Sequence, residues 1–196
     1  MEKKSTNRAK QAMATKKRIY KFGIKLIQQH GLDGVNITQI AKAAGVSVGT
    51  FYHYYSSKLD LFMDLYRSAD SYYENELAAQ ISDLPFEKKI QTFFSYYAEM
   101  AEKNGVPLTQ KMYIPENTLF ISRDTGMHFV LKNILHSAQD EGICTDSRSP
   151  ENISDDIFLI ARGVIFDWAL HEGNYNLKEK MEAMLTIYIK TFLCQD

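Results

Sequence analysis

The chain contains little of what marks disulfide-stabilised, secreted or membrane-spanning proteins. Its 196 residues include two cysteines, four prolines and one tryptophan. Cys144 and Cys194 lie 50 residues apart, with no other Cys or His at metal-ligand spacing. We expect them to be reduced and structural, with a redox sensor as the minor alternative. No run of 18 apolar residues occurs, and no signal-peptide core follows the basic N-terminus, so we expect a cytoplasmic protein without a membrane partner.

Motifs of common enzyme classes are also missing. The sequence has no Gly-rich phosphate loop, no His-Glu-x-x-His and no Cys-x-x-Cys. The pairs Asp155-Asp156 and His171-Glu172 fit a helix end or a solvated face better than a catalytic site. His128 and His136 are eight residues apart, which on a helix is about 12 Å and too far to share a metal. We expect no catalytic residue, no metal and no cofactor, and an enzyme is the disfavoured class.

Charge is divided unevenly along the chain. Residues 1–60 hold 11 Lys or Arg against 3 Asp or Glu, a net charge of +8, whereas residues 61–196 hold 12 against 21, a net charge of −9. Most of the cations lie in and before the first expected helix: Lys3, Lys4, Arg8, Lys10, Lys16, Lys17, Arg18, Lys21 and Lys25. Such a cluster can follow a phosphate backbone, although a solvated helix face with a disordered tail would look similar.

Two short helices separated by a turn are expected after residue 36. Asn36 with Gln39 three residues later is a capping-box pattern, which predicts that a helix starts near Ile37. Gly45 can adopt the left-handed conformation that ends a helix. Ser47 can then cap a second helix, whose first turn carries small side chains that allow close approach to another surface. This pattern predicts a helix-turn-helix.

The run Ile-Ala-Lys-Ala-Ala-Gly-Val-Ser-Val-Gly-Thr-Phe-Tyr-His-Tyr-Tyr at residues 40–55 closely resembles the N-terminal signature of the tetracycline-repressor (TetR) family of bacterial transcriptional regulators. The resemblance covers about residues 10–62. It implies that the second helix of the motif enters the major groove of DNA. The implied base-edge residues are Ser47, Val48, Gly49 and Thr50, and the implied phosphate contacts are Tyr52, His53 and Lys58. Thr38 matches a groove-facing position often held by arginine, so a bidentate guanine reader is absent there.

Helical periodicity throughout the chain predicts an all-α fold. We expect an N-terminal three-helix DNA-binding domain with a helix-turn-helix and a basic arm over residues 1–57, and a larger helical effector-binding and dimerisation domain over residues 58–196. The expected later helices span about 58–81, 85–103, 124–141, 150–171 and 177–192, with an irregular segment at 105–117 acting as a gate or pocket wall.

The last two expected helices carry many apolar residues. Those assigned to a dimer interface are Ile157, Val164, Trp168, Met181, Leu185 and Tyr188. The resemblance implies that two such helices from each subunit form a four-helix bundle, which places two recognition helices about 34 Å apart. The alternative is that these stripes form the core of a single chain.

Aromatic and methionine side chains are concentrated between the DNA-binding domain and the last two expected helices. As the walls of an effector pocket we assign Leu65, Phe93, Tyr96, Tyr97, Met100, Met112, Tyr113, Phe120, Met127, Leu131 and Phe166. Rings and flexible thioethers suit an apolar or aromatic small molecule, with Tyr hydroxyls, His128 or Arg123 supplying polar discrimination. Ordinary core packing is the alternative for each residue taken singly.

Together these patterns predict a homodimeric repressor that binds a palindromic double-stranded DNA operator and is released by a small apolar or aromatic effector. Two variants of this function stay open. The ligand could act as a corepressor, or the protein could work without a small-molecule effector.

Overall fold

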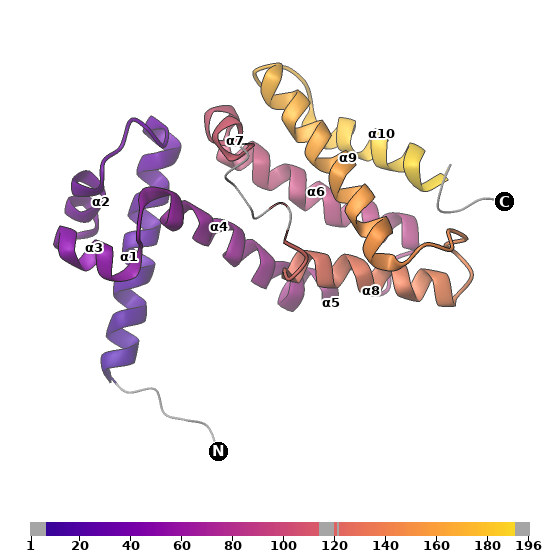
Figure 1. Ribbon diagram of the computed structural model, residues 1–196, viewed down its shortest axis with the longest axis horizontal. Helices are drawn as coiled ribbons and strands as arrows, with labels where there is room; N and C mark the ends of the chain where they lie inside the picture. Colours follow the sequence, from indigo (N-terminus) through magenta and orange to yellow (C-terminus); the bar gives the residue numbers. More distant parts are fainter. Residues whose placement is uncertain (1–6, 114–119, 121, 191–196) are drawn as a thin grey trace. The chain divides into compact units, whose positions relative to one another are not determined.

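The structure is a computed structural model that describes residues 7–113, 120 and 122–190 (Figure 1). The elements, in chain order, are α1 (Asn7–His30), α2 (Ile37–Ala44), α3 (Val48–Tyr54), α4 (Lys58–Tyr72), the π-helix η1 (Tyr73–Leu77), α5 (Ala78–Gln80), α6 (Phe86–Asn104), α7 (Val106–Met112), α8 (Gly126–Asp140), α9 (Pro150–Leu170) and α10 (Leu177–Tyr188). No strand occurs in the part of the chain that the structure describes, and the all-α prediction is confirmed.

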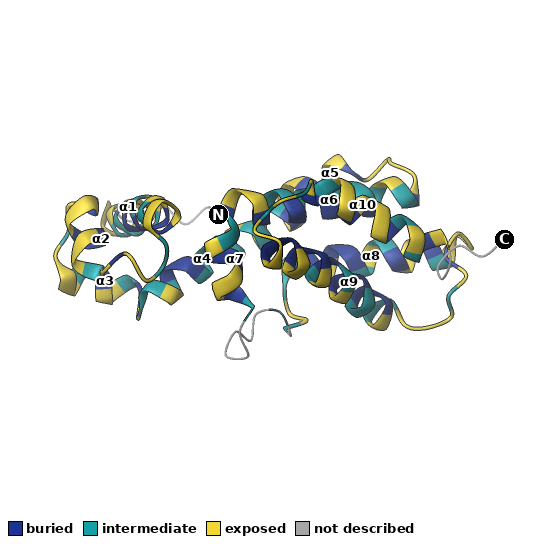
Figure 2. Cartoon of the chain, turned by 90° about the horizontal axis from the view of Figure 1, so that it is seen from above, coloured by how far each residue is buried: buried dark blue, intermediate teal, exposed yellow. Residues whose placement is uncertain are grey.

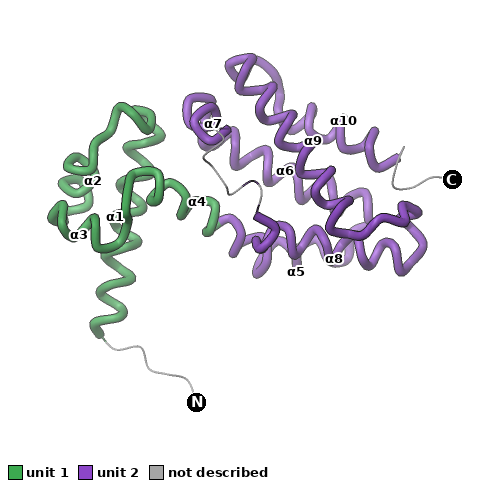
Figure 3. The backbone as a smooth tube through the Cα atoms, viewed as in Figure 1, with its two compact units in different colours: residues 1–68 green, residues 69–196 purple. Residues whose placement is uncertain are grey.

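The chain divides into two compact units, residues 1–68 and residues 69–196 (Figure 3). The division falls within α4, whereas the expected domain boundary lies at the start of that helix. Each unit has its own core.

The first unit packs α1, α2 and α3 against the beginning of α4. Its core consists of fully buried side chains from all four helices, namely Ile19, Ile27, Ile40, Phe51, Leu61 and Phe62. Gly23 of α1 faces the Leu61 side chain of α4, and an added Cβ would lie 2.7 Å from a methyl carbon of Leu61. A side chain at this position would require the buried Leu61 and Ile40 side chains to shift.

The second unit is a helical bundle in which α6 packs against α10, α9 packs against both α8 and α10, and α7 lies on α9. Dark blue stripes on the inward faces of these helices mark the core in Figure 2. An aromatic cluster joins α6 to α9, with the rings of Phe93, Phe94 and Tyr97 each about 5–6 Å from that of Phe158. Edge-to-face contacts of this kind stabilise a core beyond the area that they bury.

The long helix expected over residues 58–81 is present but is not uniformly α-helical. Its middle, Tyr73–Leu77, is a π-helical turn between α4 and α5. The sequence pattern did not indicate this turn, because a π-turn changes the backbone hydrogen-bond register without requiring a particular residue.

The prediction of an irregular segment over residues 105–117 is wrong in part. Val106–Met112 forms the helix α7, which begins directly after Gly105. Pro107 does not break this helix because it lies in the first turn, where the missing N–H has no intrahelical partner to lose. Residues 114–117 of the same expected segment, and the end of the last expected helix at 191–192, lie outside the described residues.

Candidate nucleic-acid interface and ligand cavities

The turn between α2 and α3 is held by the caps that the sequence predicts. Asn36 Oδ1 accepts a hydrogen bond from the Gln39 N–H at 2.9 Å, and Gln39 Oε1 accepts one from the Asn36 N–H at 2.8 Å. Gly45 ends α2 with φ of 64°, in the left-handed region. Ser47 Oγ accepts a hydrogen bond from the Thr50 N–H at 3.0 Å and caps α3. The helix-turn-helix prediction is therefore confirmed at its caps.

The letters Gly45-Val46-Ser47-Val48-Gly49 also match the Gly-x-Ser-x-Gly pattern of hydrolase nucleophile elbows. That elbow places its serine between a strand and a helix. Here a helix precedes the turn, and the Ser47 hydroxyl is occupied as a helix cap. This geometry argues against a nucleophile and for a structural turn.

Most residues expected to contact DNA are exposed on α2, on α3 or at the cap of α3. The exposed members are Thr38, Ser47, Val48, Gly49, Tyr52 and His53. Thr50 is half-buried, and its hydroxyl lies 2.8 Å from the Ser47 hydroxyl. Gly49 faces open space, since an added Cβ would meet only Ser47 Oγ at 3.8 Å. The first turn of α3 can therefore approach a flat surface closely.

Lys58 has a structural role that the sequence did not indicate. Its Nζ donates hydrogen bonds to the carbonyl oxygens of Leu32, at 2.7 Å, and Val35, at 2.6 Å. These bonds tie the start of α4 to the segment between α1 and α2. An ammonium group has three donors, so one is left for a phosphate, and the phosphate contact of Lys58 stays a prediction.

Cationic side chains extend along the surface of α1. Arg8, Lys10, Lys17, Arg18, Lys21 and Lys25 are exposed there, and none forms an ion pair within the described residues. Lys16 differs, because its Nζ lies 2.8 Å from Asp64 Oδ2. Lys3 and Lys4 lie outside the described part of the chain. The unpaired cations of α1 are available for phosphates.

The expected effector-pocket residues do not meet in one described cavity. Phe93, Tyr97, Met112, Met127 and Leu131 are buried in the core of the second unit. Tyr96, Met100, Tyr113 and Phe120 are partly buried, Phe166 is exposed, and Leu65 belongs to the first unit. None of these residues lines the three cavities described below. These five residues belong to the packed interior of the second unit, and their role in an effector pocket stays a prediction.

The residues expected at the dimer interface lie mostly inside their own chain, and their role in a dimer stays a prediction. Ile157, Val164, Trp168, Met181 and Leu185 are buried within their own chain, and Tyr188 is partly buried. The apolar side chains that α9 and α10 expose are Leu159, Phe166, Leu170, Met184 and Ile187. On α9 the exposed stripe runs through Gly163, which has no neighbouring atoms within 4 Å of an added Cβ. These exposed apolar residues of α9 lie close in sequence to the residues that were expected at the interface, on a different stripe of the same helix.

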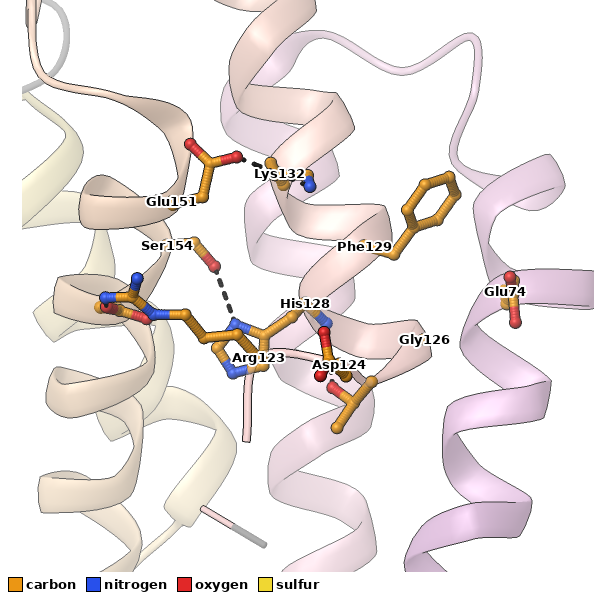
Figure 4. Close-up of a pocket in the computed structure, with 11 residues that line it drawn as sticks. Glu74, Arg123, Asp124, Gly126, His128, Phe129, Lys132, Glu151 and Ser154 are labelled. Carbon is orange, nitrogen blue, oxygen red and sulfur yellow. Dashed lines mark hydrogen bonds and ion pairs between the residues drawn. The ribbon is translucent and has the colours of Figure 1, made fainter. Parts of the chain in front are cut away.

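A charged cavity of about 520 Å³ lies at the N-terminal end of α8, with α9 on one side and η1 on the other (Figure 4). Its walls comprise Glu74, Arg123, Asp124, Thr125, Gly126, His128, Phe129, Lys132, Glu151, Ser154 and Asp155. Arg123 is ion-paired with Asp155, and Lys132 Nζ lies 3.5 Å from Glu151 Oε1. His128 and Arg123, which are among the polar groups suggested for an effector pocket, both line this cavity.

His128 is held between the cavity and the core. Its ring lies 4.3 Å from the ring of Phe158, and its Nδ1 is 3.4 Å from Ser154 Oγ. Burial lowers the pKa of His128 below its ordinary value, because the charged imidazolium would lose hydration. The imidazole is therefore neutral near pH 7.

Further hollows occur among the described residues of the second unit. A shallow groove of about 280 Å³ follows α8 beside η1 and α5, and it shares Glu74 and Phe129 with the charged cavity. Its apolar lining consists of Ala78, Ile81, Phe129, Val130 and Ile134, and its polar lining consists of Glu74, Ser82, Lys89, Asn133 and Ser137. Another hollow, of about 490 Å³, lies at the connection between α9 and α10 and includes Asp167, His171 and Lys180.

Across the described residues, no group of three or more His, Cys, Asp or Glu side chains could hold a metal ion. Among the same residues, no helix is both long and apolar enough to cross a bilayer.

Comparison with known proteins supplies relatives for both units. The sequence profile of "Bacterial regulatory proteins, tetR family" matches residues 19–65. The chain is similar to the probable acrEF/envCD operon repressor of Escherichia coli, with 22% identity over 200 residues that cover 93% of this chain and 89% of that protein.

Two solved structures share the fold. One is FadR from Thermus thermophilus, a TetR-family transcriptional repressor in complex with lauroyl-CoA, with a TM-score of 0.73 and 20% identity over 92% of this chain and 96% of that one. The other is a putative transcriptional regulator from Saccharomonospora viridis in complex with choline, with a TM-score of 0.68 and 12% identity over 94% and 100%. These relatives are described as transcriptional regulators.

Proposed function

We propose that this chain is a repressor of the TetR family, whose profile matches residues 19–65, and that it binds a palindromic operator as a homodimer and leaves it when a small organic effector binds. Residues 1–57 would contact DNA, and residues 58–196 would bind the effector and the second subunit. The observation that carries this function is the capped helix-turn-helix with an open, exposed first turn of α3.

Base contact through α3 is supported by its chemistry. Ser47 and Thr50 offer hydroxyl groups, Val48 offers methyl groups, and Gly49 leaves room for the groove floor. Tyr52 and His53 are exposed next to them and can donate to phosphate oxygens. The unpaired cations of α1 add a sequence-independent attraction that falls with salt.

A homodimer is supported by the exposed apolar face of α9 and α10. Leu159 is 64% exposed and Ile187 is 60% exposed, and large exposed apolar patches mark protein–protein interaction sites. One module with a single recognition helix reads few base pairs, so useful specificity calls for two half-sites. An isologous pair of these faces would bury them in both copies.

The effector is supported by the hollows of the second unit rather than by the buried aromatic residues. The charged cavity of about 520 Å³ is within the range of roughly 300–1,000 Å³ common for small-molecule sites. The relatives of known structure were solved with lauroyl-CoA and with choline. We infer a small organic effector for this chain as well, and the sign of its effect on DNA binding is part of the test.

Selection from a pool of random duplexes tests the proposed function. The purified protein should enrich a two-fold symmetric site, and its affinity should fall with salt on a log–log slope of about −4 to −7, as for roughly five to eight neutralised phosphates. Failure to enrich any sequence, with or without added candidate effectors, would overturn the repressor proposal. Tighter binding with an effector would instead assign the corepressor sign.

A further inference from the structure

The charged cavity and the groove along α8 lie next to each other at the seam between α8 and the helix that carries η1. Glu74 and Phe129 line both hollows. In Figure 4, Phe129 extends from α8 toward the helix that bears Glu74. A single elongated molecule could therefore place one end in the cavity and the other along the groove.

The charge of the cavity end is negative. Its walls carry two cations, Arg123 and Lys132, and four carboxylates. The two cations are matched by Asp155 and Glu151. Glu74 and Asp124 remain without an ion pair or side-chain hydrogen bond in the described structure. With His128 neutral, the lining has a net charge of −2, which favours a cationic group.

The aromatic ring between the two hollows suits the same kind of ligand. Phe129 is 50% exposed, although the residues next to it on α8, Val130 and Leu131, are buried. A quaternary or protonated amine held over this ring would gain a cation–π contact while facing Glu74. The apolar lining of the neighbouring groove, which includes Ile81, Val130 and Ile134, would cover an apolar tail.

The cavity also touches an unusual backbone feature. Glu74 belongs to the π-helical turn Tyr73–Leu77, and such turns often occur at functional sites. The seam next to it is tight, since an added Cβ on Gly126 would lie 2.5 Å from the carbonyl oxygen of Asp70. Asp70 Oδ1 accepts the Met127 N–H at 3.2 Å, which holds the start of α8 against the end of α4.

We propose that this site binds an organic cation with an apolar tail, with the charged head between Glu74 and Asp124 over Phe129 and the tail in the groove along α8. Such a ligand would bind next to the close contact between Gly126 and Asp70. Asp70 belongs to α4, the helix that begins at Lys58 in the first unit. The link from this site to DNA release rests on the proposed function. Binding of the cation itself does not.

The direct test is calorimetric titration of the full-length protein with decyltrimethylammonium below its micelle concentration. Decyl sulfate, with the same tail and the opposite charge, and lauroyl-CoA serve as anionic probes. We expect saturable binding of the cation and at least tenfold weaker binding of both anions. Equal binding of cation and anions, tighter binding of either anion, or no saturable cation binding would overturn the proposal.

Substitutions in the lining of the cavity test whether decyltrimethylammonium binds at this site. Glu74→Gln and Asp124→Asn should each weaken decyltrimethylammonium binding about three- to tenfold, and Phe129→Leu should weaken it about twofold to fivefold. Glu102→Gln is the matched control, because Glu102 is an exposed carboxylate on α6 away from both hollows, and it should bind as the wild type does. Unchanged affinity in both Glu74→Gln and Asp124→Asn would also overturn the proposal.

Operator binding separates this inference from the proposed function. If the protein binds an operator but not the cation, the proposed repressor function stands and the proposed ligand site is wrong. If the protein binds the cation through Glu74 and Asp124 but enriches no DNA sequence, the proposed ligand site stands and the proposed repressor function is wrong.

Discussion

At the scale of single residues, Gly49 sets how closely α3 can approach DNA. Its Cα faces open space, so Gly49→Leu should fold normally and gain about 0.5–1 kcal/mol of helix stability from the loss of glycine. The added side chain would hold the helix away from the groove floor. We expect operator affinity to fall at least tenfold, measured by fluorescence anisotropy, with an unchanged or higher Tm. Retained affinity would show that α3 does not read bases through this turn.

Asp64 is the residue whose ionisation stabilises the first unit. Burial raises its pKa, but hydrogen bonds from Lys16, Arg67 and Tyr55 outweigh that effect and hold the pKa below its usual value. A carboxylate with a depressed pKa stabilises the fold above the ordinary Asp pKa of about 3.9. That contribution is lost as pH falls through the lower folded-state pKa.

Asp64→Asn should therefore destabilise the protein by about 1 kcal/mol at pH 7, a value discounted because Lys16 and Arg67 are largely exposed. The difference in free energy of unfolding between wild type and variant should shrink as pH falls below about 4. Urea unfolding of both proteins at pH 7 and at pH 3 measures this difference in free energy of unfolding. A difference of the same size at both values would contradict the assigned role of the carboxylate.

At the scale of elements, the start of α2 depends on the capping box of Asn36 and Gln39. Asn36→Ala removes the acceptor for the Gln39 N–H and should cost about 1 kcal/mol, with a Tm lower by several degrees. Asn36→Ser is the matched control, since serine caps helices about as well as asparagine. If both variants lose equal stability, the cap is not what holds α2 in place.

These caps could be predicted because they act within a few residues. Asn36, Gly45 and Ser47 each satisfy backbone groups of their own helix, so the pattern needs no tertiary information. The π-helical turn at Tyr73–Leu77 and the helix α7 could not be predicted in the same way. Both depend on how their helices pack, and Pro107 is compatible with either a loop or a first helical turn.

At the scale of the whole molecule, the face formed by Leu159, Phe166, Leu170, Met184 and Ile187 should decide the oligomeric state. In a two-fold dimer each substitution acts twice. Burying one leucine or isoleucine side chain contributes about 1.5–3 kcal/mol, so Leu159→Glu with Ile187→Glu should convert the dimer to a monomer. Sedimentation velocity measures the state, and operator affinity should fall at least a hundredfold because one half-site is lost.

Leu84→Glu is the control for this pair, since Leu84 is also an exposed leucine but lies between α5 and α6. It should remain dimeric and bind the operator normally. A Leu159→Glu, Ile187→Glu protein that stays dimeric would place the interface elsewhere on the chain.

The sequence by itself determined the helical fold, the capped turn, the surface of α3 and the separation of basic and acidic halves. Each follows from local periodicity, capping or composition. Only the tertiary structure decided which face of each helix is buried. Helices α9 and α10 are apolar on more than one side, and periodicity cannot tell which stripe meets the core. The packing of α6 likewise turned Phe93 and Tyr97 into core, and the meeting of η1 with α8 created the site at Glu74 and Phe129. Contacts between residues distant in sequence decide these features, so no local pattern encodes them.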